Sequence, residues 1–133
     1  METIEEWAEA LKKSNKFIIV EGKKDKQALE QLGIKKIITF SNSPHFSIEN
    51  LSEKEVVILT DLDKHGKKLY SILKHNLQAR GIKIDKQFRE FLYKETRIRN
   101  IETLRRIPIG TGKDKSKHIP KNENLNKIKS AYF

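Results

Sequence analysis

Three carboxylates follow short apolar segments in this sequence. Glu21 comes directly after the apolar run 17–20, and Asp61 and Asp63 come directly after a second such run. In a near-extended segment, residues two apart point the same way, so Asp61 and Asp63 are expected to share a pocket while Leu62 faces the protein. Clustered carboxylates repel one another when ionised, and a cation lets them sit together. Hard oxygen ligands of this kind suit Mg²⁺, and Mn²⁺ as a second choice.

The surroundings of the carboxylates favour a phosphate as the substrate group. A metal at this position polarises a phosphoryl oxygen or activates water, and a neighbouring glutamate can move protons as general base or acid. Gly22 and Gly66 are expected to open helices, where backbone N–H groups favour an anion. Five lysines flank the acidic residues and supply further positive charge: Lys23, Lys24, Lys64, Lys67 and Lys68.

Alternating short strands and helices must position these residues. Continuous apolar runs are typical of strands that are buried on both faces of a parallel sheet. If the first and third strands are neighbours, Glu21 and the two aspartates converge beyond their carboxyl ends, where open sheets bind ligands. The patterns predict strands at 17–20, 36–40, 56–60 and 82–84, helices at 4–14, 25–32 and 66–80, and one or two closing helices between 88 and 104.

Length and composition limit the class of protein. The chain has 133 residues, which suits one domain with a modest core. It has no cysteine, which excludes disulfides and a thiolate zinc site. No apolar run approaches the roughly 20 residues that span a bilayer. The N-terminus is acidic where a signal peptide is basic, so we expect a cytoplasmic protein without a membrane partner.

Positive charge is concentrated at the C-terminal end. The formal net charge is +10, and residues 105–133 carry eight Lys or Arg against two acidic residues. Such an excess favours an anionic partner, most often nucleic acid, although a lysine-rich surface that only keeps the protein soluble fits the charge equally well. We predict a domain at 1–106 and a basic extension at 107–133. Candidate phosphate contacts in and beside this extension are Arg105, Arg106, Lys113, Lys115 and Lys117.

Two segments together resemble a known family. Segment 21–25, EGKKD, is similar to the glutamate–glycine motif of Toprim domains. Segment 60–66, TDLDKHG, is similar to their paired aspartates closed by a glycine. The resemblance covers roughly residues 15–105, and both motifs stand on the expected elements in the expected order.

The resemblance implies a fold and roles for individual residues. It implies an α/β, Rossmann-like domain with about four parallel strands flanked by helices. Glu21 would be the general acid or base, and Asp61 and Asp63 would hold Mg²⁺. The remaining motif residues, Gly22, Asp25 and Gly66, would shape the loops.

One departure narrows the choice within the family. The third aspartate of topoisomerases falls at His65, and the chain has no room for the tyrosine-bearing domain that a topoisomerase needs. The pattern is closer to the branch with two aspartates, which includes primases and the small ribonuclease that matures ribosomal RNA. The stand-alone small Toprim proteins of archaea and bacteria look most similar.

Two classes of function remain open at this point. The first is a Mg²⁺-dependent nucleic-acid phosphodiesterase, with an RNA-processing nuclease preferred and RNA favoured over DNA. The second is a non-catalytic RNA- or DNA-binding module, or an assembly factor of a ribonucleoprotein or of a replication or repair complex. A nucleotidyl transferase would need a nucleotide pocket that the sequence does not indicate. Oligomeric state is left open.

Several residues also have a plain structural interpretation. Asp25 is expected to be a helix N-cap, and Glu21 fits a solvated loop residue as well as a catalytic one. His65 is interpreted as an exposed loop residue rather than a phosphate contact. The aromatic residue Phe46, beside His45, is expected to tuck a long loop onto the core.

Overall fold

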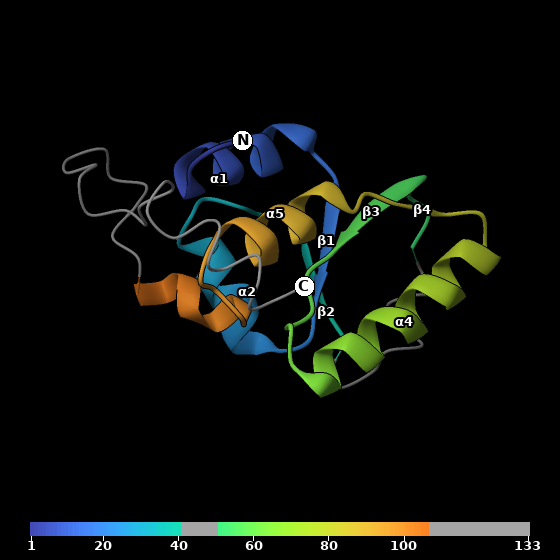
Figure 1. Ribbon diagram of the computed structural model, residues 1–133. Helices are drawn as coiled ribbons and strands as arrows, with labels where there is room; N and C mark the ends of the chain where they lie inside the picture. The colour runs from blue at the N-terminus through green and yellow to red at the C-terminus, as the bar shows by residue number, and fades with distance from the viewer. Residues whose placement is uncertain (41–50, 107–133) are drawn as a thin grey trace.

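The computed structural model describes residues 1–40 and 51–106 as an α/β domain (Figure 1). The chain runs through four short strands that alternate with helices. The elements in order are α1 (Ile4–Ser14), β1 (Phe17–Val20), α2 (Lys23–Glu30), β2 (Ile37–Thr39), β3 (Glu55–Ile58), α4 (Lys64–Ala79), β4 (Lys83–Ile84), α5 (Gln87–Glu95) and the 3₁₀ helix η1 (Ile101–Arg106).

All four strands pair in parallel, in the order β2-β1-β3-β4. Ile19 of β1 lies between Ile38 of β2 and Ile58 of β3. From β1 the chain moves to one edge of the sheet through α2, and from β3 it moves to the other edge through α4. The boundary between β1 and β3 is therefore the topological switch point, as the sequence predicts.

Two apolar clusters cover the two faces of the sheet. Figure 1 shows α1, α2 and α5 on one side of the strands and α4 on the other. Side chains alternate between the faces along each strand, so Ile18 and Val57 face the first group of helices while Ile19 packs with Leu73 and Leu77 of α4. Strands that are buried in this way explain the continuous apolar runs in the sequence.

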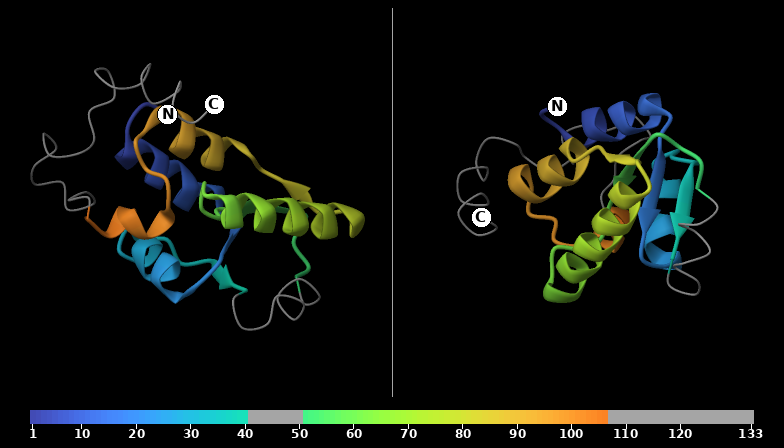
Figure 2. Two further views of the ribbon diagram at one scale, coloured as in Figure 1. Left: turned by 60° about the horizontal axis from the view of Figure 1, so that its bottom comes forward. Right: turned by 90° about the vertical axis from the view of Figure 1, so that its right-hand side faces the viewer.

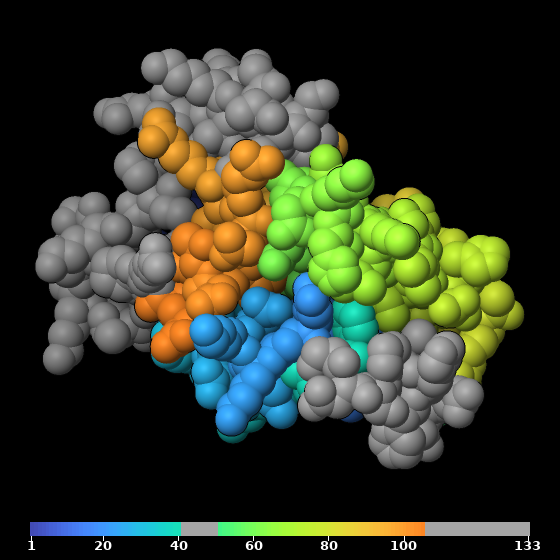
Figure 3. Space-filling model, turned by 90° about the horizontal axis from the view of Figure 1, so that it is seen from below, coloured from blue at the N-terminus to red at the C-terminus, as the bar shows by residue number. Residues whose placement is uncertain are grey.

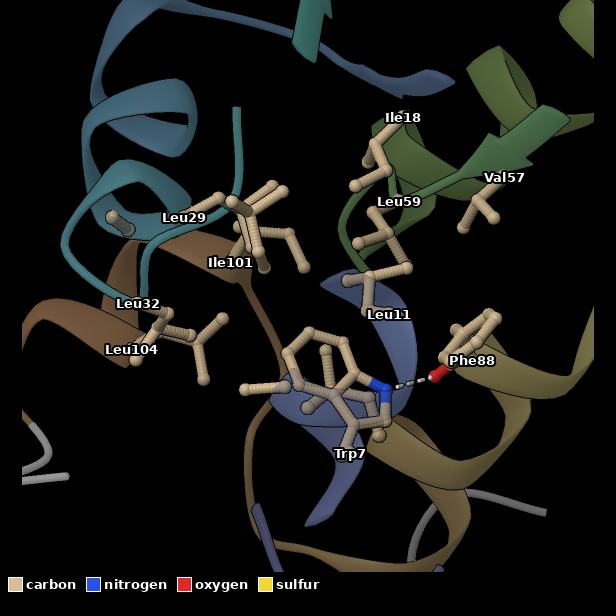
Figure 4. Packing of buried hydrophobic residues seen from close by; sticks show 14 of the residues in the cluster. Trp7, Leu11, Ile18, Leu29, Leu32, Val57, Leu59, Phe88, Ile101 and Leu104 are labelled. Atoms are coloured by element: carbon tan, nitrogen blue, oxygen red, sulfur yellow. Dashed lines mark hydrogen bonds between the residues drawn. The ribbon is translucent and has the colours of Figure 1, made fainter. Parts of the chain in front are cut away.

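The larger cluster is centred on Trp7 of α1. Its indole is fully buried, and its Nε1–H donates a hydrogen bond to the backbone oxygen of Phe88 at 2.8 Å (Figure 4). The bond satisfies the one polar atom of an otherwise apolar side chain and fixes α1 against α5. Figure 4 also shows Leu29 of α2 near Ile101, and Leu32, just after α2, near Leu104 of η1, so this cluster joins both ends of the described chain.

The predicted boundaries differ from the observed ones at two helices. Helix α2 begins at Lys23 and α4 begins at Lys64, each two residues earlier than the sequence pattern indicates. Apolar periodicity cannot detect a first turn made of exposed lysines, and the capping residues set these starts instead. The predicted N-terminal helix is confirmed, including a capping box between Thr3 and Glu6.

Some expectations fall outside the described residues. Both His45 and Phe46 lie in the segment 41–50, and the basic extension lies at 107–133. The division between a domain at 1–106 and this extension therefore stays a prediction. Within the described ranges, no helix is long and apolar enough to cross a membrane.

Candidate metal and phosphate site

The candidate site lies where β1 and β3 end, at what we call the carboxyl edge of the sheet. The Leu59 N–H donates to the oxygen of Ile19 at 2.8 Å, so pairing continues past the last residue of β3. Ile19 pairs with Ile58, and Glu21 and Asp61 follow within three residues, so both carboxylates lie at this edge and repel each other. Figure 3 looks onto this edge and shows α2, η1 and the beginning of α4 meeting around it.

Asp61 is held by the segment that leads into η1. Its Oδ1 accepts a hydrogen bond from the Ile101 N–H at 3.0 Å, and the neighbouring Leu62 N–H donates to the oxygen of Arg99 at 2.8 Å. Burial raises the pKa of the Asp61 carboxyl, the Ile101 bond opposes this rise, and Asp63 and Glu21 add to it by repulsion. The side chain is half-buried, so it is fixed in place and still reaches the edge.

Asp63 caps α4. One of its carboxylate oxygens, Oδ1, accepts the Gly66 N–H at 2.7 Å, which satisfies a free donor of the first helical turn. The residue is exposed, so its other oxygen faces the carboxyl edge or solvent. Leu62 between the two aspartates is buried, as the alternation of side chains predicts.

Gly66 does not open α4, contrary to our expectation. It is the third residue of the helix and is buried, because the helix starts at the Asp63 cap. A Cβ at this position would lie 2.1 Å from the backbone oxygen of Asp61. The Thr60 hydroxyl also donates to the oxygen of Gly66 at 2.8 Å. Glycine is thus needed here for close packing between α4 and the aspartate loop.

Glu21 contacts His65, which we expected to be only an exposed loop residue. Its Oε2 lies 3.3 Å from Nε2 of His65, in the first turn of α4. The contact is an ion pair when the imidazole is protonated. His65 is exposed as predicted, but it also links the end of β1 to the start of α4.

Asp25 forms part of the acidic group, and it is not the N-cap that we expected. Gly22 caps α2, and its N–H donates to Oδ2 of Asp25 at 3.2 Å. Burial raises the pKa of Asp25 to about 6, helped by repulsion from Asp61 and then, more weakly, from Glu21 and Glu102, and opposed by the Gly22 bond. The sequence could have placed Asp25 in this acidic group, because it lies four residues after Glu21. It could not have placed Glu102 there, because Glu102 lies some 40 positions beyond Asp61 and outside both motifs.

The predicted phosphate-binding lysines surround this edge on two helices. All of them are exposed, in the first turn of α2 or near the start of α4. Arg105 is exposed on η1. The side chain of Arg106, and the residues Lys113, Lys115 and Lys117, fall outside the described part of the chain.

The donor chemistry of the edge fits a magnesium ion. No group of three or more His, Cys, Asp or Glu side chains is arranged to hold a metal among residues 1–40 and 51–106. Magnesium, however, usually binds through one or two carboxylates, with water and substrate phosphate completing its shell. The raised pKa values of Asp25 and Asp61 reflect burial together with repulsion between neighbouring carboxylates, which a bound cation would relieve. Asp61 and Asp63 are the residues that would hold the ion.

Comparison with known proteins identifies the family. A family model described as Toprim domain matches residues 15–87, which contain both motifs and the whole β1–β3 switch point. This chain belongs to the Toprim family. Membership associates it with nucleic-acid-related, metal-dependent functions.

Relatives of this Toprim protein occur in archaea and in a bacterium. A UPF0292 protein of Methanocaldococcus jannaschii is 36% identical over 111 residues, which cover 78% of this chain and 85% of the relative. A UPF0292 protein of Pyrococcus abyssi is 40% identical over 78 residues, 56% of this chain and 59% of the relative. A solved structure of a protein from Aquifex aeolicus has a TM-score of 0.69 and 34% identity, and covers 77% of this chain and 98% of that one. The predicted kinship with small Toprim proteins is confirmed.

Proposed function

We propose that this Toprim protein is a Mg²⁺-dependent phosphodiesterase that cleaves structured RNA. The observation that carries the proposal is the meeting of Glu21, Asp61 and Asp63 at the carboxyl edge, with exposed lysines on both adjoining helices. A phosphodiester approaching this edge meets carboxylates that can hold a cation and lysines that can neutralise its backbone. A cytoplasmic location is part of the same proposal.

Each residue has a distinct role in this proposal. Asp61 and Asp63 would hold Mg²⁺, which would supply positive charge that stabilises the phosphoryl oxygens. Glu21 accepts or delivers the proton, and its contact with His65 holds the carboxylate on the side of β1 that faces the aspartates. Lys23, Lys24, Lys64, Lys67 and Lys68 bind the flanking phosphates.

A cleavage assay tests this function directly. The purified chain is incubated with end-labelled structured RNA and with DNA, in Mg²⁺, in Mn²⁺ and in chelator. Asp61→Asn is expected to abolish cleavage, and Glu21→Gln to slow it strongly while RNA binding is kept. Glu30→Gln, an exposed glutamate at the end of α2, is the matched control and is expected to cleave normally. Full activity of Asp61→Asn, or cleavage in chelator, would rule out the proposed mechanism.

A second candidate, a binding module without turnover, also has specific support. Asp61 Oδ1 and Asp63 Oδ1 both accept backbone hydrogen bonds, so part of each carboxylate serves the fold. In this case the edge grips a phosphate, and the protein acts within a ribonucleoprotein or a repair assembly. Tight RNA binding that survives chelation, with no cleavage of any substrate, is the result that would favour it.

A further inference from the structure

A cleft lined mainly by positively charged side chains lies between α4 and α5, outside the carboxylate site. It has a volume of about 300 Å³, and Figure 2 shows the two helices as neighbours in both views. Four basic side chains line it against one acidic side chain. The lining residues are Tyr70, Lys74, Lys86, Arg89, Glu90 and Lys94.

Arg89 forms the inner wall of this cleft. Its guanidinium carbon lies 4.4 Å from the ring centroid of Tyr70 and 5.1 Å from that of Tyr93, so the charge is stacked between two aromatic side chains. Burial lowers the pKa of Arg89. Its Nε is buried and has no hydrogen-bond partner in the described part of the chain. The cation is therefore rigidly placed and incompletely satisfied.

Two lysines, Lys74 of α4 and Lys86 just before α5, line the cleft together. The nearby Lys86 lowers the pKa of Lys74, because each ammonium group disfavours the charge on the other. The Lys74 ammonium is 6.0 Å from the ring centroid of Tyr70, so it sits above the same aromatic side chain as Arg89. Two positive charges that lie near each other repel when no anion is present. A phosphate bound between the two lysines would remove this repulsion.

Arg89 also connects the cleft to the carboxylates. Its Nη2 donates to the backbone oxygen of Asp61 at 3.1 Å, while the Ile101 N–H donates to the side chain of the same residue. A nucleic-acid strand whose phosphate lies at the carboxyl edge would therefore have a second cationic position nearby.

We propose that the α4–α5 cleft binds a phosphodiester group of a single nucleic-acid strand, outside the carboxylate site. The identity of the ligand rests on the proposed function, because both sites would contact one strand. Lysines supply point charges for a phosphate, and Arg89 supplies a fixed donor group. The cleft extends the substrate-binding surface along α4, away from the acidic residues.

A binding measurement without chemistry tests the cleft. A fluorescently labelled single-stranded RNA is titrated with the full chain carrying Asp61→Asn, in chelator, over a series of salt concentrations. Adding Lys74→Ala and Lys86→Ala together is expected to weaken binding roughly tenfold at low salt and to reduce the log–log salt slope by about 0.7, the contribution of the one phosphate contact on a single strand that the cleft would make. Lys13→Ala with Lys35→Ala, two exposed lysines that do not line the cleft, is the matched control; Lys35 precedes β2, at the opposite edge of the sheet from β4.

If the cleft variant and the control variant bind the RNA with equal affinity, the proposal that the cleft binds nucleic acid is wrong. This result is independent of the nuclease assay. If wild-type protein cleaves RNA with Mg²⁺ but the cleft variant binds like the control, only the cleft fails. If the cleft variant binds weakly but no metal-dependent cleavage is found, only the catalytic proposal fails. A wild-type chain without affinity for RNA or DNA overturns both.

Cross-linking gives a second readout that does not depend on affinity. The chain has no cysteine, so Lys74→Cys and Lys35→Cys each introduce a single thiol. After labelling with a thiol-reactive photo-cross-linker, the protein with the label at position 74 is expected to attach to the labelled RNA, and the one at position 35, at the opposite edge of the sheet, is not. Equal yields at both positions contradict the proposal.

Discussion

Oε2 of Glu21 lies 3.3 Å from Nε2 of His65. The contact crosses the switch point, because Glu21 directly follows β1 and His65 belongs to the first turn of α4, which comes after β3. The His65 side chain is 64% exposed, so solvent screens the pair and its contribution to folding is small. The contact with His65 instead orients the carboxylate of Glu21, the group to which we assign proton transfer.

Replacing this histidine is expected to affect turnover rather than folding. His65→Ala leaves Glu21 without its neighbour, so kcat for RNA cleavage should fall about tenfold, with KM nearly unchanged. Thermal unfolding should stay within a few degrees of wild type. His75→Ala, an exposed histidine farther along α4, is the control and should match wild type in both measurements. A rise in KM with unchanged kcat would instead assign His65 to phosphate binding.

Gly66→Ala is expected to destabilise the protein although alanine normally favours a helix. The new Cβ would lie 2.1 Å from the oxygen of Asp61, so the loop or the helix must move. We expect a loss of about 1–3 kcal/mol in the free energy of unfolding, measured with denaturant. Ser71→Ala, an exposed site on the same helix, should be neutral or slightly stabilising. A stabilised Gly66→Ala protein would contradict the close packing.

The raised pKa of Asp25 predicts that the free energy of unfolding depends on pH in the acidic range. Burial raises the pKa of Asp25 in the folded state to about 6, above the ordinary value of 3.8 for an aspartate. Between these values the folded chain binds more protons than the unfolded chain, so this residue makes stability fall as pH rises from about 4 to 6. Asp25→Asn should remove that slope and add about 1–3 kcal/mol at neutral pH in chelator. Unfolding curves at several pH values, with Glu30→Gln as control, measure it.

Removal of the basic extension is expected to weaken binding without changing where RNA is cut. Residues 107–133 carry a large share of the net charge but none of the acidic motif residues. A chain ending at residue 107 should lose affinity for RNA of any sequence and show a smaller salt slope. The cleavage pattern on a labelled RNA is the control. Unchanged affinity would show that the extension does not contact the substrate.

The sequence predicts the sheet and the three motif carboxylates because both depend on local patterns. Apolar runs mark the buried strands, and Glu21, Asp61 and Asp63 follow directly from two of them. The parallel order that joins β1 to β3 then follows from the alternation of strands and helices.

The partners of these carboxylates could not be predicted in the same way. Ile101 binds Asp61 from 40 residues away, and Arg89 does so from 28 residues away. Neither contact has a repeating pattern or fixed spacing in the sequence. The role of Gly66 was also misjudged, since a helix start and a close approach between helix and loop both favour glycine.

The bond between Asp61 and Ile101 has a consequence for the order of events during synthesis. A ribosome makes the aspartate 40 residues before the amide that holds it, and the Arg99 oxygen beside it also comes late. A nascent chain that stops before residue 99 can contain both motifs, all four strands and Arg89, yet the carboxylate of Asp61 still lacks its backbone donor. The side chain of Asp61 is therefore fixed only after almost all of the described domain has been made.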